Sequence, residues 1–327
     1  MNRRNFIGMA GGALAAGVLS GCTTGIAGGI LPAMNGGAMD AAAFHAARRY
    51  ATTAFGNIAY IEHGTGDVAL FLHGLPLNSF QWRGAIDRLS PYRRCIAPDF
   101  MGLGYTEVAE GQSVTPDAQV AMLVALLDKL SIPTVDLIAN DSGGQAAQLF
   151  VVRHPERVRT LLLTNSDTEI DSPPQAMLPV IALSKEGKFV DQWLAPWRAD
   201  KALARSAEGI GGMCFADPLN PTDEAIETYF APLMSSMRRK ALAHAYIIAL
   251  ERNPLIGIEA ELKRCMVPTR IVWGMGDTIF SSASPDYLDR SFGNSRGVRR
   301  LEGSKLFWPE ERPDVIADEA RQLWGDA

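Results

Sequence analysis

The chain has 327 residues, of which 47% are hydrophobic and 20% are charged, and its 31 Lys and Arg against 36 Asp and Glu give a net charge of −5. A chain this apolar and this weakly charged is not intrinsically disordered, and its length suits one large domain, or a domain with an insertion. Without long runs of Lys and Arg, no nucleic-acid partner is expected. Composition therefore favours a globular enzyme that meets small or uncharged partners.

Residues 1–22 have the pattern of an export signal. Arg3-Arg4 precedes an apolar stretch, Phe6 to Leu19, that is too short to span a bilayer. The run from Arg3 to Ile7 resembles a twin-arginine signal, which carries folded proteins across the bacterial inner membrane. We therefore expect an exported protein of the bacterial periplasm or cell envelope.

The run from Leu19 to Cys22 resembles a lipobox, which would make Cys22 a lipidated N-terminus. Membrane contact is then expected only through this lipid. Residues 23–45 are rich in Gly and Ala and are predicted to form a flexible tether. The remaining cysteines are predicted to be buried free thiols, since their neighbours are apolar or strand-like: Cys95, Cys214 and Cys265.

The body of the chain alternates predicted strands with predicted helices. Strands are predicted at 57–62, 68–73, 94–98, 134–139, 160–164 and 268–273, and helices at 116–130 and 144–153. Continuous apolar runs such as 68–72 are typical of parallel strands that are covered on both faces. This pattern predicts a doubly wound, mostly parallel α/β sheet formed by residues 46–165 and 255–327. Residues 166–254 break the alternation and are predicted to form a helical cap over the carboxyl ends of the strands.

A strand, a tight turn and a helix meet at Asp141. Val135 to Ala139 reads as a strand, Gly143 to Ala147 opens a helix, and the turn between them is Asn140-Asp141-Ser142. Small residues two positions before and two positions after Asp141 are what a strained turn needs if its central side chain is to stand clear of the backbone.

With this turn, called the nucleophile elbow below, the chain resembles the α/β-hydrolase family. The resemblance is to the branch of haloalkane dehalogenases and epoxide hydrolases, which carry aspartate at the centre of the elbow. Three further strings support the resemblance in the expected order: His73-Gly74-Leu75-Pro76, Pro98 to Gly104 and Arg153 to Val158. The resemblance covers the chain from about Arg48 onwards. It implies an α/β-hydrolase fold with a cap inserted late in the sheet.

The resemblance also implies roles for single residues. Asp141 would attack a saturated carbon to form an alkyl-enzyme ester. The backbone N–H groups of Leu75 and Ser142 would form the oxyanion hole, and His73 and Gly74 would shape the loop that holds Leu75. A small hydrophobic molecule is the expected partner, and no cofactor or metal is expected, since no cluster of His, Cys and carboxylate residues has ligand spacing.

Ser142 is an alternative nucleophile, but Asn140 is bulky where that elbow would need a small residue, so the pattern favours Asp141. Asp277 follows the predicted strand 268–273 where the family keeps its catalytic acid. The other location that dehalogenases use for the acid holds Asn165 here.

The catalytic base is where the sequence departs from the family. Aligning Glu310-Glu311-Arg312-Pro313 with the family pattern puts Leu306 at the position of the histidine, 29 residues after Asp277. Leucine holds no proton, so the group that would activate water is missing. Lys305 and His244 are the alternative bases left open.

Residues that would hold a leaving group are also changed, with Ser142 and Leu75 where dehalogenases have halide-binding side chains. Tyr229 and Tyr246 lie in the cap, where they could protonate an opening epoxide or serve only for packing.

Three candidate functions follow from these observations. The first is a hydrolase that turns over through an unrecognised base. The second is a hydrolase-fold protein that binds, or is alkylated by, a hydrophobic ligand without turnover. The third is different chemistry, such as a lyase or a Ser142 esterase.

Overall fold

The computed structural model describes residues 39–326. The predicted export signal at 1–22, including Cys22, and most of the predicted tether lie outside the described residues. Within residues 39–326, no helix is both long enough and apolar enough to cross a membrane.

The C-terminal end of the predicted tether is structured, so its boundary at residue 45 is wrong. Helix α1 spans Ala41–Ala47, and the Asp40 side chain caps it by accepting from the backbone N–H of Ala43. Phe44 is buried in the core and packs edge-to-face on Phe80, with 5.0 Å between ring centroids. The Ala-rich composition concealed this short helix, which is held by its cap and one aromatic anchor.

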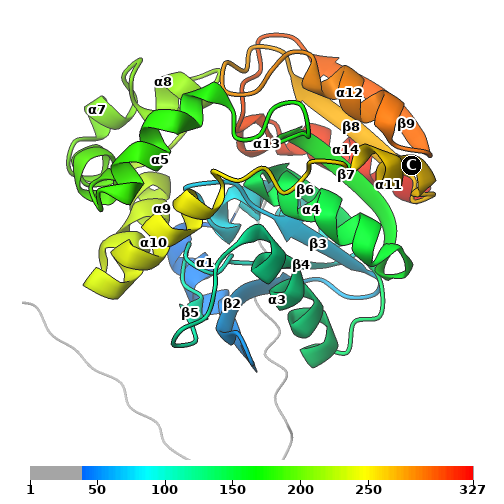
Figure 1. Cartoon of the computed structure of the whole chain (residues 1–327). Helices are drawn as coiled ribbons and strands as arrows, with labels where there is room; N and C mark the ends of the chain where they lie inside the picture. Colours follow the sequence, from blue (N-terminus) through cyan, green and yellow to red (C-terminus); the bar gives the residue numbers. More distant parts are fainter. Residues whose placement is uncertain (1–38, 327) are drawn as a thin grey trace, which may run out of the picture. The chain divides into compact units, whose positions relative to one another are not determined.

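A nine-stranded sheet forms the centre of the protein (Figure 1). Its strands are β1 (Arg49–Thr53), β2 (Gly56–His63), β3 (Val68–Leu72), β4 (Arg94–Pro98), β5 (Glu107–Val108), β6 (Val135–Asp141), β7 (Val158–Ser166), β8 (Thr269–Gly274) and β9 (Ser295–Leu301). The order is β1-β2-β4-β3-β6-β7-β8-β9, with β5 paired to β2. Strand β2 pairs antiparallel with β1, β4 and β5. The remaining pairs are parallel: β4 with β3, β3 with β6, β6 with β7, β7 with β8, and β8 with β9. This is the doubly wound, mostly parallel sheet that the sequence predicted.

The six predicted strands are all present, but β1, β5 and β9 were missed. Strand β9 carries Arg296, Arg299 and Arg300 and is largely half-exposed at the edge of the sheet. Strand β1 is exposed at the opposite edge. Edge strands lack the continuous apolar run that marks the buried centre of a parallel sheet, which explains why the pattern missed them.

Helices cover both faces of the sheet. One face carries α3 (Pro116–Lys129), α4 (Ser142–Arg153), α11 (Glu259–Arg264) and α12 (Ser284–Ser291), and the other carries α2 (Arg83–Leu89), α13 (Trp308–Glu311) and α14 (Pro313–Trp324). Short 3-10 turns lie at η1 (Ser79–Trp82) and η2 (Pro155–Arg157). Two apolar clusters fill the layers, and the smaller one packs Phe71 and Trp82 against α14. The layers fix the carboxyl ends of β3, β6, β7 and β8 close together.

The segment between β7 and β8 contains the cap helices. They are η3 (Gln175–Met177), α5 (Leu178–Lys185), η4 (Val190–Leu194), α6 (Ala195–Ala199), α7 (Lys201–Ala204), α8 (Ile210–Cys214), α9 (Asp223–Met234) and α10 (Met237–Ala249). Figure 1 shows them gathered at one end of the sheet, in green to yellow. An aromatic row holds the cap together, with ring centroids 5.5 Å apart for Trp193 and Trp197 and 6.2 Å apart for Trp197 and Phe230.

Candidate active site

Asp141 sits on a strained turn between β6 and α4. Its backbone has φ 56° and ψ −133°, whereas Ser142 already belongs to the helix. A positive φ costs an aspartate about 1–3 kcal/mol and is kept only where the surrounding structure enforces it. A Cβ on Gly143 would lie 2.5 Å from the Leu72 carbonyl oxygen, so only glycine lets the strand and helix meet so closely. The elbow therefore presents Asp141 rather than Ser142.

The loop after β3 holds the Asp141 carboxyl. The backbone N–H of Leu75 donates to Asp141 Oδ2 at 2.7 Å. A Cβ on Gly74 would lie 2.5 Å from the same oxygen, so the carboxyl rests against a position where no side chain fits. The structure thus brings together Gly74, Leu75, Asp141 and Ser142, four residues that the sequence assigned to one site.

His73 is fully buried, and both of its ring nitrogens form hydrogen bonds. Its Nε2 accepts from the backbone N–H of Phe100 at 3.0 Å, so Nδ1 carries the proton and donates to the carbonyl of Gly74 at 2.9 Å. Burial lowers the pKa of this imidazole, which favours the neutral form that these contacts require. The ring spans two loops and has no nitrogen left to accept a proton from water.

Asn140 and Gln81 form a buried network that the sequence reasoning missed. Asn140 Nδ2 donates to Thr164 Oγ1 at 2.8 Å and to the carbonyl oxygens of Asn165 and Leu306 at 3.1 Å. Its Oδ1 accepts from Gln81 Nε2 at 2.7 Å, and Gln81 Oε1 accepts from the backbone N–H of Gly74 at 3.0 Å. Asn140, a buried polar residue directly after the apolar run Leu137-Ile138-Ala139 of β6, was the available signal. The network ties the loop of Gly74, the elbow and the loop of Leu306 to one another.

Asp277 and Asn165 are also brought together. Asn165 Nδ2 donates to Asp277 Oδ2 at 2.8 Å, and the backbone N–H of Ile279 donates to Oδ1 at 2.8 Å. Burial raises the pKa of Asp277 to about 6 in spite of these donors. Asn165, which stands at the alternative acid position, therefore anchors the carboxyl of Asp277.

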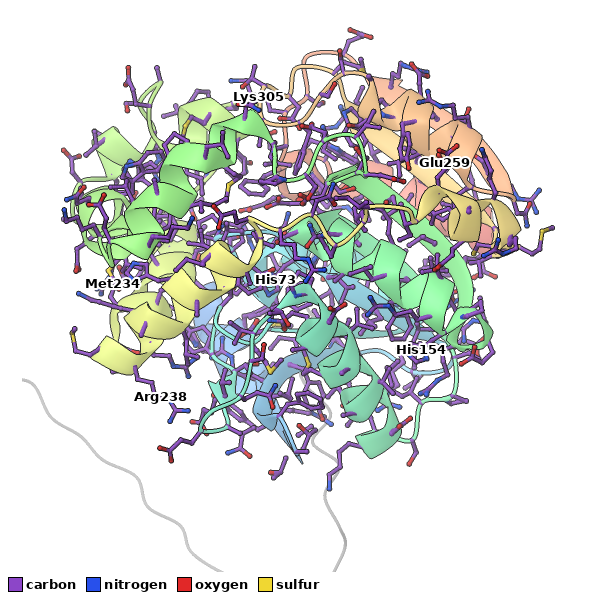
Figure 2. All side chains as sticks on the ribbon, in the orientation of Figure 1. His73, His154, Met234, Arg238, Glu259 and Lys305 are labelled. Carbon is purple, nitrogen blue, oxygen red and sulfur yellow. The ribbon has the colours of Figure 1, made fainter. Side chains whose placement is uncertain are left out.

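Leu306 is buried and its side chain lines the same cavity as Asp141. Neither alternative base that the sequence left open is free. His244 Nε2 accepts from the backbone N–H of Val190 at 3.2 Å within the cap, and Lys305 Nζ donates to the carbonyl of Gly212 at 2.6 Å. Figure 2 shows His154 beyond the far end of α4, away from the elbow.

The cap tyrosines have different surroundings. Tyr229 donates to Glu310 Oε2 at 2.7 Å and receives a hydrogen bond from Arg83, so it belongs to a buried ion-pair cluster. Tyr246, on α10, donates to Ser142 Oγ at 3.0 Å and is buried. Only Tyr246 of these two brings its hydroxyl to the residue beside Asp141.

The Asp141 carboxyl is electrostatically unusual. Burial raises its pKa well above the ordinary value, and the neighbouring Asp167 raises it further. The backbone N–H groups of Leu75 and Ser142 oppose these effects because they stabilise the charged form. Burial likewise raises the pKa of Asp167 to about 7, against the hydrogen bond from Ser172. Asp167 lies near the candidate nucleophile and was not recognised from the sequence.

A largely apolar cavity of about 100 Å³ lies between the sheet and the cap. It is lined by Leu75, Pro76, Asp141, Ala176, Met177, Val180, Phe189, Trp193, Trp197, Ile210, Met213, Cys214, Ile279 and Leu306. Asp141 is the one residue in this lining that carries a carboxyl. An apolar cavity of about 150 Å³ takes up benzene, so this space suits a small apolar ligand. In the described part of the chain, no three His, Cys, Asp or Glu side chains are placed to hold a metal ion.

Cys95, Cys214 and Cys265 are free and buried, which confirms the prediction for these thiols. Cys214 lines the cavity, and burial together with the charges of Asp277 and Asp141 raises its pKa well above the ordinary value. A thiol held protonated in this way is a poor nucleophile.

A capped α/β sheet with an acidic elbow beside a small apolar cavity defines a hydrolase class, and comparison with known proteins agrees. The family model described as alpha/beta hydrolase fold matches residues 68–304. The chain belongs to the α/β-hydrolase family.

Within this family the chain is similar in sequence to haloalkane dehalogenases and similar in fold to an epoxide hydrolase. It is 29% identical over 297 residues to a haloalkane dehalogenase of Agrobacterium fabrum, covering 83% of this chain and 90% of the relative. It is 29% identical over 232 residues to the cis-3-alkyl-4-alkyloxetan-2-one decarboxylase of Shewanella oneidensis, covering 68% of this chain and 70% of the relative. The structure of the epoxide hydrolase CorEH has a similar fold, with a TM-score of 0.70 at 20% identity over 85% of this chain and 98% of that one.

Proposed function

We propose that Asp141 is a nucleophile that opens small apolar electrophiles of the alkyl halide, epoxide or ester type. A single observation carries the proposal: Asp141 is the one carboxyl-bearing residue lining an apolar cavity, where the backbone N–H of Leu75 holds its carboxyl. Attack of Asp141 on a saturated carbon forms a C–O bond and breaks the bond to the leaving group. The product is an alkyl ester of Asp141.

Hydrolysis of this ester would complete the reaction. Water adds to the ester carbonyl, negative charge develops on the carbonyl oxygen, and the N–H groups of Leu75 and Ser142 stabilise that charge. Asn165 holds the Asp277 carboxyl, but Leu306 stands at the sequence position where the family keeps its histidine. Turnover therefore depends on a base other than the family histidine, and without one the ester accumulates.

The test is incubation of the purified protein with 1-bromobutane, a terminal epoxide and a short ester, followed by product analysis and intact mass. We expect covalent addition of the alkyl group at Asp141, with or without released alcohol. Asp277→Asn is the matched control, because it removes a neighbouring buried carboxyl and leaves the nucleophile in place. Product formation that is unchanged in Asp141→Asn would contradict the proposal.

A second candidate is decarboxylation of a small β-lactone, and Leu306 favours it because this reaction consumes no water. Attack of Asp141 on the saturated ring carbon that is bonded to the ring oxygen forms an alkyl ester, breaks that C–O bond and frees the lactone carboxyl as a carboxylate. Loss of CO₂ then forms the C=C bond and expels Asp141 as a carboxylate, so that all atoms and electrons balance. The relative from Shewanella oneidensis is named for decarboxylation of this ring.

A dialkyl β-lactone separates the two candidates. Release of an alkene and CO₂, with no uptake of oxygen from water, supports decarboxylation. Release of a hydroxy acid supports hydrolysis. Leu306→His should increase the rate of hydrolysis of the ester intermediate. It should not increase the rate of alkene formation, because that reaction needs no base to activate water.

We further propose that the protein works outside the cytoplasm, carried by the twin-arginine-like segment at residues 3–7 and held by a lipid on Cys22. Support comes from the order of these motifs in the sequence. Cell fractionation with Cys22→Ala as the control tests this, since loss of the lipid should move the protein from the membrane to the soluble periplasmic fraction.

A further inference from the structure

Gln81 is a buried polar side chain that the chemistry described so far does not use. It lies on the 3-10 turn η1 and is 1% exposed, between two fully buried apolar neighbours in the sequence, Phe80 and Trp82. Burying an amide is costly unless its donor and its acceptor are both paired. The surroundings of Gln81 must therefore supply a partner to each end of its amide.

The two ends of the Gln81 amide contact different parts of the candidate active site. Oε1 accepts from the backbone N–H of Gly74 at 3.0 Å, and Nε2 donates to Asn140 Oδ1 at 2.7 Å. Gly74 immediately precedes Leu75, whose N–H holds the Asp141 carboxyl. Asn140 immediately precedes Asp141 in β6. Gln81 therefore bridges the two segments that meet at the nucleophile.

The contacts of Asn140 fix the direction of this bridge. Asn140 Nδ2 donates to the carbonyl oxygens of Asn165 and Leu306, which can only accept. The amide oxygen of Asn140 must therefore face Gln81. Gln81 must then present its NH₂ group to Asn140 and its oxygen to the N–H of Gly74. Turning either amide around would set oxygen against oxygen at one contact and N–H against N–H at the other, so the bridge has one arrangement.

The peptide that carries the Leu75 N–H is held at its carbonyl end as well. The carbonyl oxygen of Gly74 accepts from His73 Nδ1 at 2.9 Å and from the backbone N–H of Leu77 at 3.0 Å. Glycine has the widest backbone freedom of any residue, so a turn at Gly74 keeps one conformation only when contacts hold it on both sides. His73 and Leu77 supply the contacts on one side, and Gln81 supplies the contact on the other.

We propose that Gln81 is a positioning residue of this site, which locks the turn at Gly74 so that the Leu75 N–H stays on the Asp141 carboxyl. This inference rests on the proposed function. Gln81 is not among the described residues that line the cavity, so it acts through its neighbours and not on the ligand. Misplacing a reacting group by about 1 Å can cost about 10²-fold in rate. Loss of Gln81 should therefore slow the reaction of a bound ligand and leave ligand binding unchanged.

The test measures alkylation by 1-bromobutane as intact mass against time, at a series of 1-bromobutane concentrations. Gln81→Met keeps the length of the side chain but removes its donor and its acceptor. We expect the maximum rate of alkylation to fall about 10- to 100-fold. The concentration of 1-bromobutane that gives half of this rate should stay at the wild-type value, because the cavity lining is the same.

Gln119→Met is the matched control for the loss of a buried amide. Gln119 lies on α3, accepts from the backbone N–H of Met101, and donates to the carbonyl oxygens of Met101 and Val114. These bonds hold main-chain groups outside the turn at Gly74. Gln119→Met should therefore lower the free energy of unfolding, as Gln81→Met does, yet become alkylated at the wild-type rate.

Gln81→Glu separates positioning from packing, because only one protonation state of the introduced carboxyl can replace the amide. A protonated carboxyl accepts from the Gly74 N–H and donates to Asn140 as the amide does, whereas a carboxylate only accepts. The alkylation rate of this variant should be close to that of wild type at about pH 5 and fall toward that of Gln81→Met at about pH 9. Comparing variant and wild type at the same pH removes the titration of Asp141 itself. This variant keeps the test valid if Gln81→Met folds poorly.

Two results would overturn the inference and leave the proposed function intact. One is an unchanged maximum rate of alkylation in a folded Gln81→Met protein. The other is a Gln81→Glu protein that becomes alkylated as slowly as Gln81→Met at every pH. Absence of any adduct in the wild type would remove the proposed function and this inference with it.

Discussion

Two loops line the cavity beside Asp141. They differ in whether they present a polar group to the cavity. The loop after β3 presents the Leu75 N–H to the Asp141 carboxyl at 2.7 Å and has glycine where a side chain would collide with that carboxyl. The loop before α13 is also fixed, through the Leu306 carbonyl, which accepts from Asn140 at 3.1 Å. Its side chain, however, is an apolar leucine. Main-chain contacts therefore maintain the geometry of both loops, while one side chain decides whether the second loop can move a proton.

We expect the largest loss of activity from removing the Asp141 carboxyl, which lies beside both loops. Asp141→Asn should lower alkylation and product formation by about 10⁴-fold or more, because the amide is not a nucleophile. Rates with 1-bromobutane and intact mass check this. Asp277→Asn should still be alkylated, so loss of alkylation in both variants would point to a general structural effect instead.

Restoring the proton acceptor tests the second loop. Leu306→His should raise hydrolysis of a preformed Asp141 ester by about 10²-fold, within the usual range for a general base. Leu306→Asn is the matched control, since it is polar but holds no basic group. Decay of the adduct mass measures the rate, and equal decay in both variants would show that position 306 does not reach the ester.

Crowding the first loop tests its part in aiming the nucleophile. Gly74→Ala places a Cβ 2.5 Å from Asp141 Oδ2 and should slow alkylation about 10- to 100-fold by displacing the carboxyl. Gly187→Ala meets no atom within 4 Å but has φ 70°, so it should cost about 1–2 kcal/mol of stability without slowing alkylation. Equal alkylation in the two variants would contradict the tight approach at Gly74.

The smallest expected effect is on the free energy of unfolding. Asp167 and Asp277 have pKa values raised to about 7 and about 6, so the folded state binds protons more tightly than the unfolded state. Stability from these groups is therefore greatest at low pH and falls as pH rises from about 4 to about 7. Asp167→Asn should flatten this fall and stabilise the protein at pH 8 by about 1–2 kcal/mol. Denaturant unfolding at pH 5 and pH 8 checks the sign.

The sequence predicted the centre of the sheet because β3, β6 and β7 are buried on both faces and carry continuous apolar runs. It missed β1 and β9, whose exposed edges carry polar residues. Residues 41–45, assigned to the tether, are helical because Asp40 caps α1 and Phe44 is buried, and neither fact is visible in composition.

The elbow was predictable because a tight turn restricts its neighbours to small residues within a few positions. Asn140, Gln81 and Asp167 were not, since they reach the site only through pairing and packing between distant segments. Gln81 and Asn140 form a hydrogen bond although they are 59 positions apart, and Asp167 directly follows Ser166, the partner of Asp141 in the register of β6 and β7. Local pattern carries no information on such contacts.

The proposed function depends on a covalent ester of Asp141, and one measurement detects that ester directly. The protein is treated with 1-bromobutane in water enriched in ¹⁸O, digested, and the peptide that contains Asp141 is weighed. We predict that this peptide carries either a butyl group or, after hydrolysis at the ester carbonyl, one or two ¹⁸O atoms. Butanol formation with neither change on that peptide would contradict it.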